Sequence, residues 1–305
     1  MTYNTAGILL GEDGEKVEAI NSGFSKLDTS MGGFRCGNTY LLSGLEKSGK
    51  TSLLLNWVSN FIKQGKHVTF VSTEMSYKEL VLRTASIRGI KPGWDKSHEK
   101  SELNEQLKNN FSFVGVEDLV VDGGLSVKQM EAVIGQRVVN GSDIVIVDNL
   151  TTFGSQQSSS EPSWQKVAVA ITKIVNMAKV SNLPFLIVLH IKPSTTFKET
   201  PSGIKSLIEN DQPLKIFDES VTIINKPSLV DVYGGGGVLS QLSGAILLWR
   251  PYQKFDKSSV KGASAIILES MRHSESGVMI RAEYDGASGR FTEEVTLEEA
   301  RKLFN

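Results

Sequence analysis

The sequence predicts an α/β fold in which a mostly parallel central sheet is flanked by helices and ends in antiparallel strands. Two strongly apolar runs, Asp143–Asp148 and Pro184–His190, alternate with longer amphipathic stretches. Strands that are apolar on both faces and alternate with helices are typical of a parallel sheet covered on both sides. Near the C-terminus, Ala265–Met271 and Val278–Tyr284 are separated only by a turn sequence, which predicts antiparallel strands there.

The other elements continue this alternation along the chain. Further strands are expected at Thr39–Ser43, His67–Ser72, Leu119–Val121, Ala245–Arg250 and Gly289–Glu293. Helices are expected at Lys50–Lys63, Tyr77–Arg88, Ser126–Asn140, Pro162–Val180 and Leu297–Phe304. The segment Ile191–Val230 is polar and irregular. An unstructured stretch of that length inside a domain is usually either functional or disordered.

The composition is that of an ordinary globular protein, and it excludes several classes. The net charge of the 305 residues is −1, which argues against a protein that coats nucleic acid broadly and without specificity. The single cysteine, Cys36, excludes a disulfide framework and a cysteine-based zinc cluster, and it indicates a reducing compartment. No apolar run is long enough for a bilayer and no signal peptide is recognisable, so we expect a cytoplasmic protein with no membrane partner.

A phosphate-binding loop is the strongest chemical signal in the sequence. Residues 44–51 fit the pattern G-x-x-x-x-G-K-[ST], and they lie between a predicted strand and a predicted helix. Glycines let backbone N–H groups point at a phosphate, the lysine reaches the β/γ-phosphates, and the hydroxyl binds Mg²⁺. The expected nucleotide-binding residues are Gly44, Lys47, Ser48, Gly49, Lys50, Thr51 and Ser52. The alternative, a turn without a ligand, does not explain this strand–loop–helix context.

Polar residues directly follow three predicted strands. Asp148 ends the strand DIVIVD, at the sheet edge where ligands bind in open α/β folds, and it is a candidate Mg²⁺ ligand. The alternative for Asp148 is the capping of a turn. Glu74 is placed to polarise an attacking water, or to act as an acid in the N-cap region before the helix at Tyr77. His190 is a candidate sensor of the terminal phosphate, or an ordinary hydrogen-bonded strand end.

A single arginine, Arg272, follows a late strand in the segment SMRHSESG. It is a candidate for reaching the nucleotide of a neighbouring subunit, where its charge would stabilise the transition state. A surface salt bridge is the more ordinary role for one arginine, so the pattern alone leaves both roles open.

Seven segments occur in a characteristic order along the chain. They are GLEKSGKTS, VSTEMSYKELVLR, DGGLSVKQM, DIVIVDNL, LIVLHIK, GGVLSQLSGAIL and LESMRHSESG…EYDGASGRF. Together they resemble the RecA-like motor domain of hexameric replicative DNA helicases, a family that includes bacterial DnaB, phage primase-helicases and mitochondrial Twinkle. The resemblance implies an N-terminal extension over residues 1–19, a RecA-like ATPase/helicase motor domain over 20–292, and a C-terminal helix over 293–305.

The resemblance also implies a site for ATP, or another nucleoside triphosphate, with Mg²⁺ held by Thr51 and Asp148. The catalytic residues would be Lys50 as phosphate ligand, Glu74 as base, His190 as γ-phosphate sensor, Gln241 as motif glutamine, and Arg272 as arginine finger. In this family the arginine finger acts across the subunit boundary. One departure is Ser270, which stands where the family usually has a lysine.

In this family the loops after the sensor strand line a central channel and grip single-stranded DNA. The matching candidates here are Lys192, Lys198, Lys205, Gly235 and Gly236. A plain flexible linker is the alternative for the glycine run. The resemblance further implies a homo-oligomer, a hexamer in this family, with primase or other replisome proteins as candidate partners. The expected location is the cytoplasm of a bacterial cell, with a phage genome as one source.

The leading hypothesis is therefore an ATP-dependent DNA helicase that translocates on single-stranded DNA as a ring. Two alternatives stay open. A RecA- or RadA-like recombinase or recombination mediator would suit the segments INSGFSKLD and GNTYLLSG as well. A regulatory nucleotide-binding paralogue is the third hypothesis, and Ser270 is compatible with it.

Overall fold

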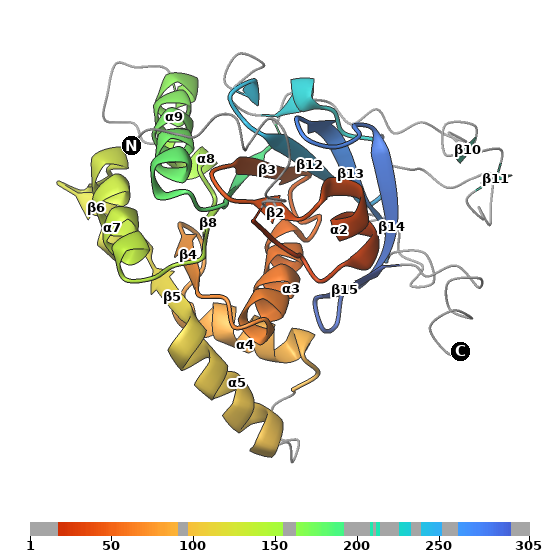
Figure 1. Cartoon of the computed structure of the whole chain (residues 1–305), viewed down its shortest axis with the longest axis horizontal. Helices are drawn as coiled ribbons and strands as arrows, with labels where there is room; N and C mark the ends of the chain where they lie inside the picture. Colours follow the sequence, from red (N-terminus) through yellow and green to blue (C-terminus); the bar gives the residue numbers. More distant parts are fainter. Residues whose placement is uncertain are drawn as a thin grey trace, which may run out of the picture.

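The central feature of the computed structural model is a nine-stranded sheet with the order β15-β14-β13-β12-β3-β9-β8-β4-β5 (Figure 1). The structure describes residues 18–90, 97–154, 163–191, 208–209, 212–213, 226–232, 239–251 and 262–293. The strands are β3 (Thr39–Gly44), β4 (Val68–Ser72), β5 (Phe111–Val114), β8 (Ile144–Asp148), β9 (Phe185–His190), β12 (Gly244–Trp249), β13 (Ala263–Met271), β14 (Val278–Asp285) and β15 (Arg290–Glu293). From β12 to β5 every neighbouring pair is parallel, whereas β13, β14 and β15 are added antiparallel. The predicted mostly parallel sheet with C-terminal antiparallel strands is confirmed.

Helices cover both faces of this sheet (Figure 1). They are α2 (Ser25–Met31), α3 (Lys50–Lys63), α4 (Tyr77–Ile87), α5 (Ser97–Asn110), α6 (Val116–Leu119), α7 (Val127–Val139), α8 (Thr151–Gly154) and α9 (Ser163–Ser181), with a 3₁₀ turn at Leu229–Asp231. Small hairpins pair β1 (Ala19–Ile20) with β2 (Phe34–Arg35), β6 (Val120–Val121) with β7 (Gly124–Leu125), and β10 (Ile208–Glu209) with β11 (Gln212–Pro213).

The core consists of two apolar layers separated by the sheet, because side chains of a strand alternate between its faces. In β3, Tyr40 and Leu42 pack with α3 and α4, whereas Leu41 packs with α7 and α9. The helix α3 is almost wholly buried, and its Trp57 and Phe61 side chains are 0% exposed. Such burial fixes the start of α3, and with it the loop that precedes it.

Four elements differ from the prediction. The polar stretch after α4 contains α5 and β5, and β5 extends the sheet by pairing parallel with β4. The strand expected at Leu119–Val121 is a two-residue β6 in a hairpin outside the central sheet, and its two valines are exposed. The entry segment folds into α2, whose buried residues are Leu27 and Met31.

Some expectations lie outside the described residues. These are the helix at Leu297–Phe304, most of the N-terminal extension, and the candidate DNA contacts Lys192, Lys198, Lys205, Gly235 and Gly236. Within the described part of the chain, no helix is both long and apolar enough to cross a membrane.

Candidate nucleotide site

The parallel strands bring the predicted site residues to one edge of the sheet. Gly44 at the end of β3 is in register with His190 at the end of β9, and Ser72 of β4 is in register with Asp148 of β8. A pocket of about 520 Å³ opens at this edge. Its charged and polar lining includes Lys50, Thr51, Glu74, Arg83, Asp148 and His190. This is the edge at which open α/β sheets bind their ligands.

The loop between β3 and α3 has the backbone geometry that its glycines permit. Gly49 has a φ of 98°, and Lys47 has a φ of 59°, so both lie in the left-handed region. A side chain at Gly49 would press against the Phe291 ring, which a Cβ would approach to 3.2 Å. Lys47, Gly49 and Ser52 line the pocket. Ser48 lies beneath it at 0% exposure.

Lys50 begins α3 and lies under the loop, with 7% of its surface exposed. Its Nζ donates to the carbonyl oxygens of Gly44, at 3.0 Å, and Leu45, at 2.7 Å. Burial lowers the pKa of Lys50 to about 8, although Asp148 and Glu74 act in the opposite direction. The ammonium is therefore held by uncharged carbonyl partners, and the negative charges of a bound phosphate chain would be much stronger ones.

Thr51 and Asp148 meet across the pocket floor. Thr51 Oγ1 donates a 2.7 Å hydrogen bond to Asp148 Oδ2, and Asp148 is 6% exposed. Burial raises the pKa of Asp148 to about 6, against the effect of the hydrogen bond from Thr51, which lowers it. A hydroxyl and a carboxylate are hard oxygen ligands of the kind that Mg²⁺ prefers, and the metal usually keeps waters and phosphate oxygens as its other ligands. The donor set therefore fits Mg²⁺.

Glu74 and His190 lie on either side of Asn149, which follows β8. Asn149 Nδ2 lies 2.7 Å from Glu74 Oε1 and 3.2 Å from His190 Nε2. Glu74 is exposed, whereas His190 is half-buried. Burial lowers the pKa of His190, and the nearby charge of Lys50 lowers it further. Glu74 thus presents a carboxylate to the pocket, and His190 presents a neutral imidazole.

Several residues of the site were not found from the sequence. Asn149 is one of them, although it stands directly after Asp148 in DIVIVDNL. Tyr284, which lines the pocket, is another. The buried Arg250 guanidinium lies 4.2 Å from the Tyr284 ring centroid, and its Nη1 donates to the Ser48 carbonyl at 3.4 Å. Arg83, on α4, lines the pocket as a further cation. The signal for Arg250 was its position at the end of an apolar strand beside β3.

Gln241 and Arg272 lie away from this pocket. The Arg272 backbone N–H donates to the Ser243 carbonyl, and its guanidinium donates to the Ser240 carbonyl, so it sits where β12 begins. The phosphate loop is level with the other end of β12, four residues further on, which corresponds to about 13 Å of strand. Gln241 accepts from Thr172 of α9 at 3.3 Å. Neither residue can complete the site of its own chain in this arrangement.

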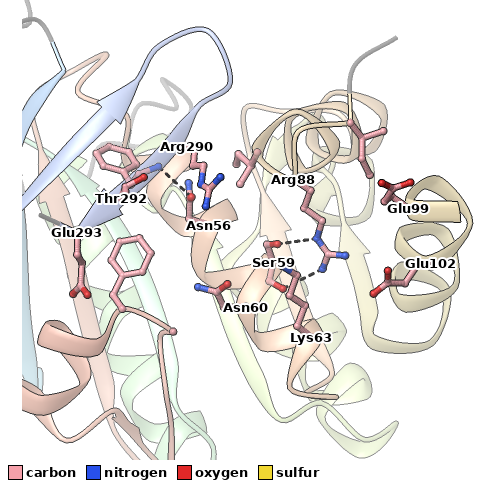
Figure 2. A pocket seen from close by; sticks show the side chains of 15 residues that line it. Asn56, Ser59, Asn60, Lys63, Arg88, Glu99, Glu102, Arg290, Thr292 and Glu293 are labelled. Atoms are coloured by element: carbon pink, nitrogen blue, oxygen red, sulfur yellow. Dashed lines mark hydrogen bonds between the residues drawn. The ribbon is translucent and has the colours of Figure 1, made fainter. Parts of the chain in front are cut away.

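A second pocket of about 520 Å³ lies further along α3 (Figure 2). Three basic residues (Lys63, Arg88, Arg290) and three acidic residues (Glu99, Glu102, Glu293) line it. Arg88 is already engaged by the Ser59 hydroxyl and carbonyl and by Gln106. Its central arginine is already paired and no part of the phosphate-binding loop lines it, whereas Lys47, Gly49 and Lys50 of that loop line the pocket described above.

The fold and the loop together define the class of this protein as a P-loop nucleotide-binding domain with the RecA-like fold. A family model for the DnaB-like helicase C terminal domain matches residues 19–201. The chain belongs to this family.

Relatives agree with that assignment. A probable replicative DNA helicase of Trieres chinensis is 22% identical over 240 residues, which are 76% of this chain and 47% of that protein. The replicative DNA helicase DnaB of Helicobacter pylori (strain J99) is 38% identical over 71 residues, which are 23% of this chain and 15% of that protein. The chain thus spans about half the length of the first relative.

Three solved structures show the same fold at low identity. An ATPase domain superposes with a TM-score of 0.70 at 16% identity, over 95% of this chain and 96% of that domain. A DnaB-like replicative helicase gives a TM-score of 0.70 at 17% identity, over 94% of this chain and 65% of that protein. A KaiC-like protein from the archaeon Pyrococcus horikoshii gives 0.58 at 16% identity, over 92% of this chain and 100% of that protein. The fold is therefore shared between helicase motors and other proteins of this class.

Proposed function

We propose that the chain is the motor of a DNA helicase, which binds ATP or a related nucleoside triphosphate with Mg²⁺ and hydrolyses it. The observation that carries the proposal is the 2.7 Å contact between Thr51 and Asp148, beside the buried Lys50. A phosphate-binding loop whose hydroxyl meets a buried strand-end carboxylate is the arrangement that P-loop enzymes use to place a Mg²⁺–nucleotide. Family membership supports the same function.

Each polar residue of the pocket has a distinct part in the proposed reaction. The backbone N–H groups of the loop and Lys50 bind the β- and γ-phosphates, which leaves the terminal phosphorus open to attack from the side of Glu74. Glu74 accepts the proton of the attacking water. His190 contacts the terminal phosphate. Mg²⁺, when bound at Thr51 and Asp148, neutralises charge on the phosphate oxygens.

Tyr284, with the buried Arg250 stacked on its ring, is proposed to contact the base or the sugar. Tyr284 lines the pocket, and a Cβ at Gly49 would lie 3.5 Å from its ring, so the ring stands beside the loop. An arginine stacked on an aromatic ring forms a rigid flat surface. Such a surface suits a planar base, which phosphate-binding residues cannot recognise.

The site is proposed to be completed by a neighbouring subunit in a ring, a hexamer in this family. Arg272 is exposed and lies at the edge of the sheet opposite its own phosphate loop. It would supply a positive charge to the nucleotide of the next subunit, as an arginine finger does. Single-stranded DNA would pass through the ring, and primase is a candidate partner, because a solved DnaB-like helicase of the same fold interacts with primase.

The test is the rate of ATP hydrolysis with and without single-stranded DNA. In parallel, the size of the protein assembly is measured in the presence of a nonhydrolysable ATP analogue. We expect DNA to stimulate turnover, the analogue to favour a ring-sized species, and the Lys50→Ala variant to lose hydrolysis. Unwinding of a forked duplex with one single-stranded tail would then separate a helicase from a recombinase. Nucleotide binding without any DNA-stimulated turnover would contradict the proposal.

A further inference from the structure

The side chain of Asn149 bridges two polar residues of the nucleotide pocket. Its Nδ2 lies within hydrogen-bond distance of both Glu74 Oε1 and His190 Nε2. Asn149 is 0% exposed, and it is therefore held in place from within the protein. One amide nitrogen thus joins the proposed base to the residue proposed to contact the terminal phosphate.

The orientation of this amide follows from its partners. Asn149 Oδ1 accepts from the Thr152 backbone N–H at 3.2 Å. An ionised carboxylate can only accept hydrogen bonds, so the atom facing Glu74 must be the NH₂ group. The backbone is fixed as well, because Thr73 Oγ1 donates to the Asn149 carbonyl at 3.0 Å and accepts from its N–H at 3.1 Å. A change at Asn149 is therefore confined to the hydrogen bonds at the end of its side chain.

The bridge fixes the tautomer of His190. An amide NH₂ only donates, so His190 Nε2 must accept, and the proton of the neutral ring is on Nδ1. A ring in this state cannot donate from Nε2 to a phosphate oxygen. Contact with a terminal phosphate therefore requires a proton on Nε2, in the other neutral tautomer or in the imidazolium. Two donors would then face each other across 3.2 Å, and the amide would have to turn away.

We propose that Asn149 is a positioning residue that keeps Glu74 from acting as the base until His190 donates a hydrogen bond to the terminal phosphate. Turning of the amide releases Glu74, because the same nitrogen makes both contacts. The inference rests on the proposed function, since it requires a nucleoside triphosphate as ligand. A nucleoside diphosphate lacks the terminal phosphate and leaves both contacts in place.

The first test reads the tautomer of His190 without turnover. ¹⁵N NMR of the imidazoles distinguishes a protonated from an unprotonated Nε2, and the His190→Ala variant assigns its signal among the four histidines. We expect Nε2 to be unprotonated in the free protein and with Mg²⁺–ADP, and protonated with Mg²⁺ and a nonhydrolysable ATP analogue. The same state in all three samples would overturn the proposal.

The second test is a double-mutant cycle on hydrolysis in the absence of DNA. The Asn149→Ala variant should turn over faster than the wild type, with KM within about twofold. The factor by which His190→Ala lowers kcat should be at least about fivefold smaller in the Asn149→Ala background than in the wild type, because Glu74 is already free.

Additive effects, or a kcat for Asn149→Ala as low as that of Glu74→Ala, would overturn the proposal. Asn110→Ala is a matched control, since it removes an amide that donates to the Gly65 carbonyl far from the pocket, and it should leave kcat unchanged. The two levels of failure are distinct. A wild type that hydrolyses no nucleotide contradicts the proposed function, whereas an active wild type with an additive cycle contradicts only the role of Asn149.

Discussion

We expect nucleotide binding to be sensitive to alkaline pH because of the ammonium group of Lys50. Burial lowers its pKa to about 8 in the free protein, whereas bound phosphates favour the charged form and raise the pKa again. Binding therefore takes up a proton at pH 8 and above. We expect the affinity for Mg²⁺–ATP to fall by about tenfold between pH 7 and pH 9, the change in the protonated fraction of a group with that pKa.

Calorimetry in buffers of different ionisation enthalpy measures the proton uptake directly. The control is Lys50→Arg, whose guanidinium stays charged over this range, so that its affinity should change little with pH. An affinity of the wild type that is constant from pH 7 to pH 9, without proton uptake, would show that Lys50 is fully charged before the nucleotide binds.

The carboxylate of Asp148 lowers the stability of the metal-free protein at neutral pH. Its pKa is raised by burial from 3.8 to about 6, so the native state favours the protonated form. The stability that this preference contributes is complete below pH 4 and is lost as the pH rises through 6. The Asp148→Asn variant has no such loss. With metal chelated, we expect it to be more stable than the wild type by about 1–3 kcal/mol at pH 7 and equally stable near pH 4.

Urea unfolding at the two pH values provides the measurement, and the same variant should lose Mg²⁺-dependent hydrolysis. Equal stability of variant and wild type at pH 7 would mean that Asp148 is solvated or paired in the free protein. A gain in stability together with a loss of activity is typical of a residue that is kept for function.

The site residues that could be predicted are those whose position follows from a strand end alone. Glu74, Asp148 and His190 each stand at or just after the C-terminal end of a parallel strand, Lys50 begins the helix that follows β3, and such ends meet at one edge. Asn149 shares that position, but nothing in the sequence shows which way its side chain turns. Its two contacts depend on side-chain geometry, so they could be found only in the structure.

At the scale of elements, the start of α2 is capped by a residue that is distant in the sequence. Phe24 stands at the N-cap and offers no hydrogen-bonding side chain. The carboxylate of Glu293, at the end of β15, accepts instead from the Leu27 N–H at 3.0 Å and from the Ser25 hydroxyl and Lys26 N–H at 3.2 Å. Since a carboxylate at a helix N-terminus satisfies free N–H groups and favours the dipole, we expect Glu293→Ala to lower the free energy of unfolding by about 1–2 kcal/mol.

Denaturant unfolding of Glu293→Ala is best compared with Glu131→Ala. Glu131 forms a 3.2 Å salt bridge with Lys173 between two partly exposed side chains, which should contribute less than about 0.5 kcal/mol. If both variants lose the same small amount of unfolding free energy, the contact between α2 and Glu293 of β15 contributes no more to stability than an exposed salt bridge.

The elements that escaped prediction are those that carry a weak pattern. In α5, only Leu103 and Leu107 are buried along 14 residues, so the helix lacks a broad apolar face. The edge strand β5 is four residues long, and two of these are only partly buried. The central strands and α3 were predictable because they are almost wholly buried and carry long apolar runs.

At the scale of the whole molecule, the two parts of the proposed shared site lie at opposite edges of the sheet. The phosphate loop lies at one end of β3 and β12, and Arg272 lies where β12 begins. A contact between unlike surfaces of identical subunits closes into a ring when the rotation between them allows it. The proposed ring would therefore place Arg272 of one subunit beside the loop of the next, although the two are far apart within a chain.

Mixing two inactive variants tests this arrangement. Lys50→Ala removes the phosphate ligand and Arg272→Ala removes the finger, so each variant alone should lack hydrolysis. In mixed rings, an interface that pairs Arg272 of the first variant with Lys50 of the second is intact. With random assembly of equal amounts, about a quarter of the interfaces would be of this kind, and about a quarter of the wild-type rate should return. If both residues acted within one chain, no mixture would recover hydrolysis, and the shared site would have to be abandoned.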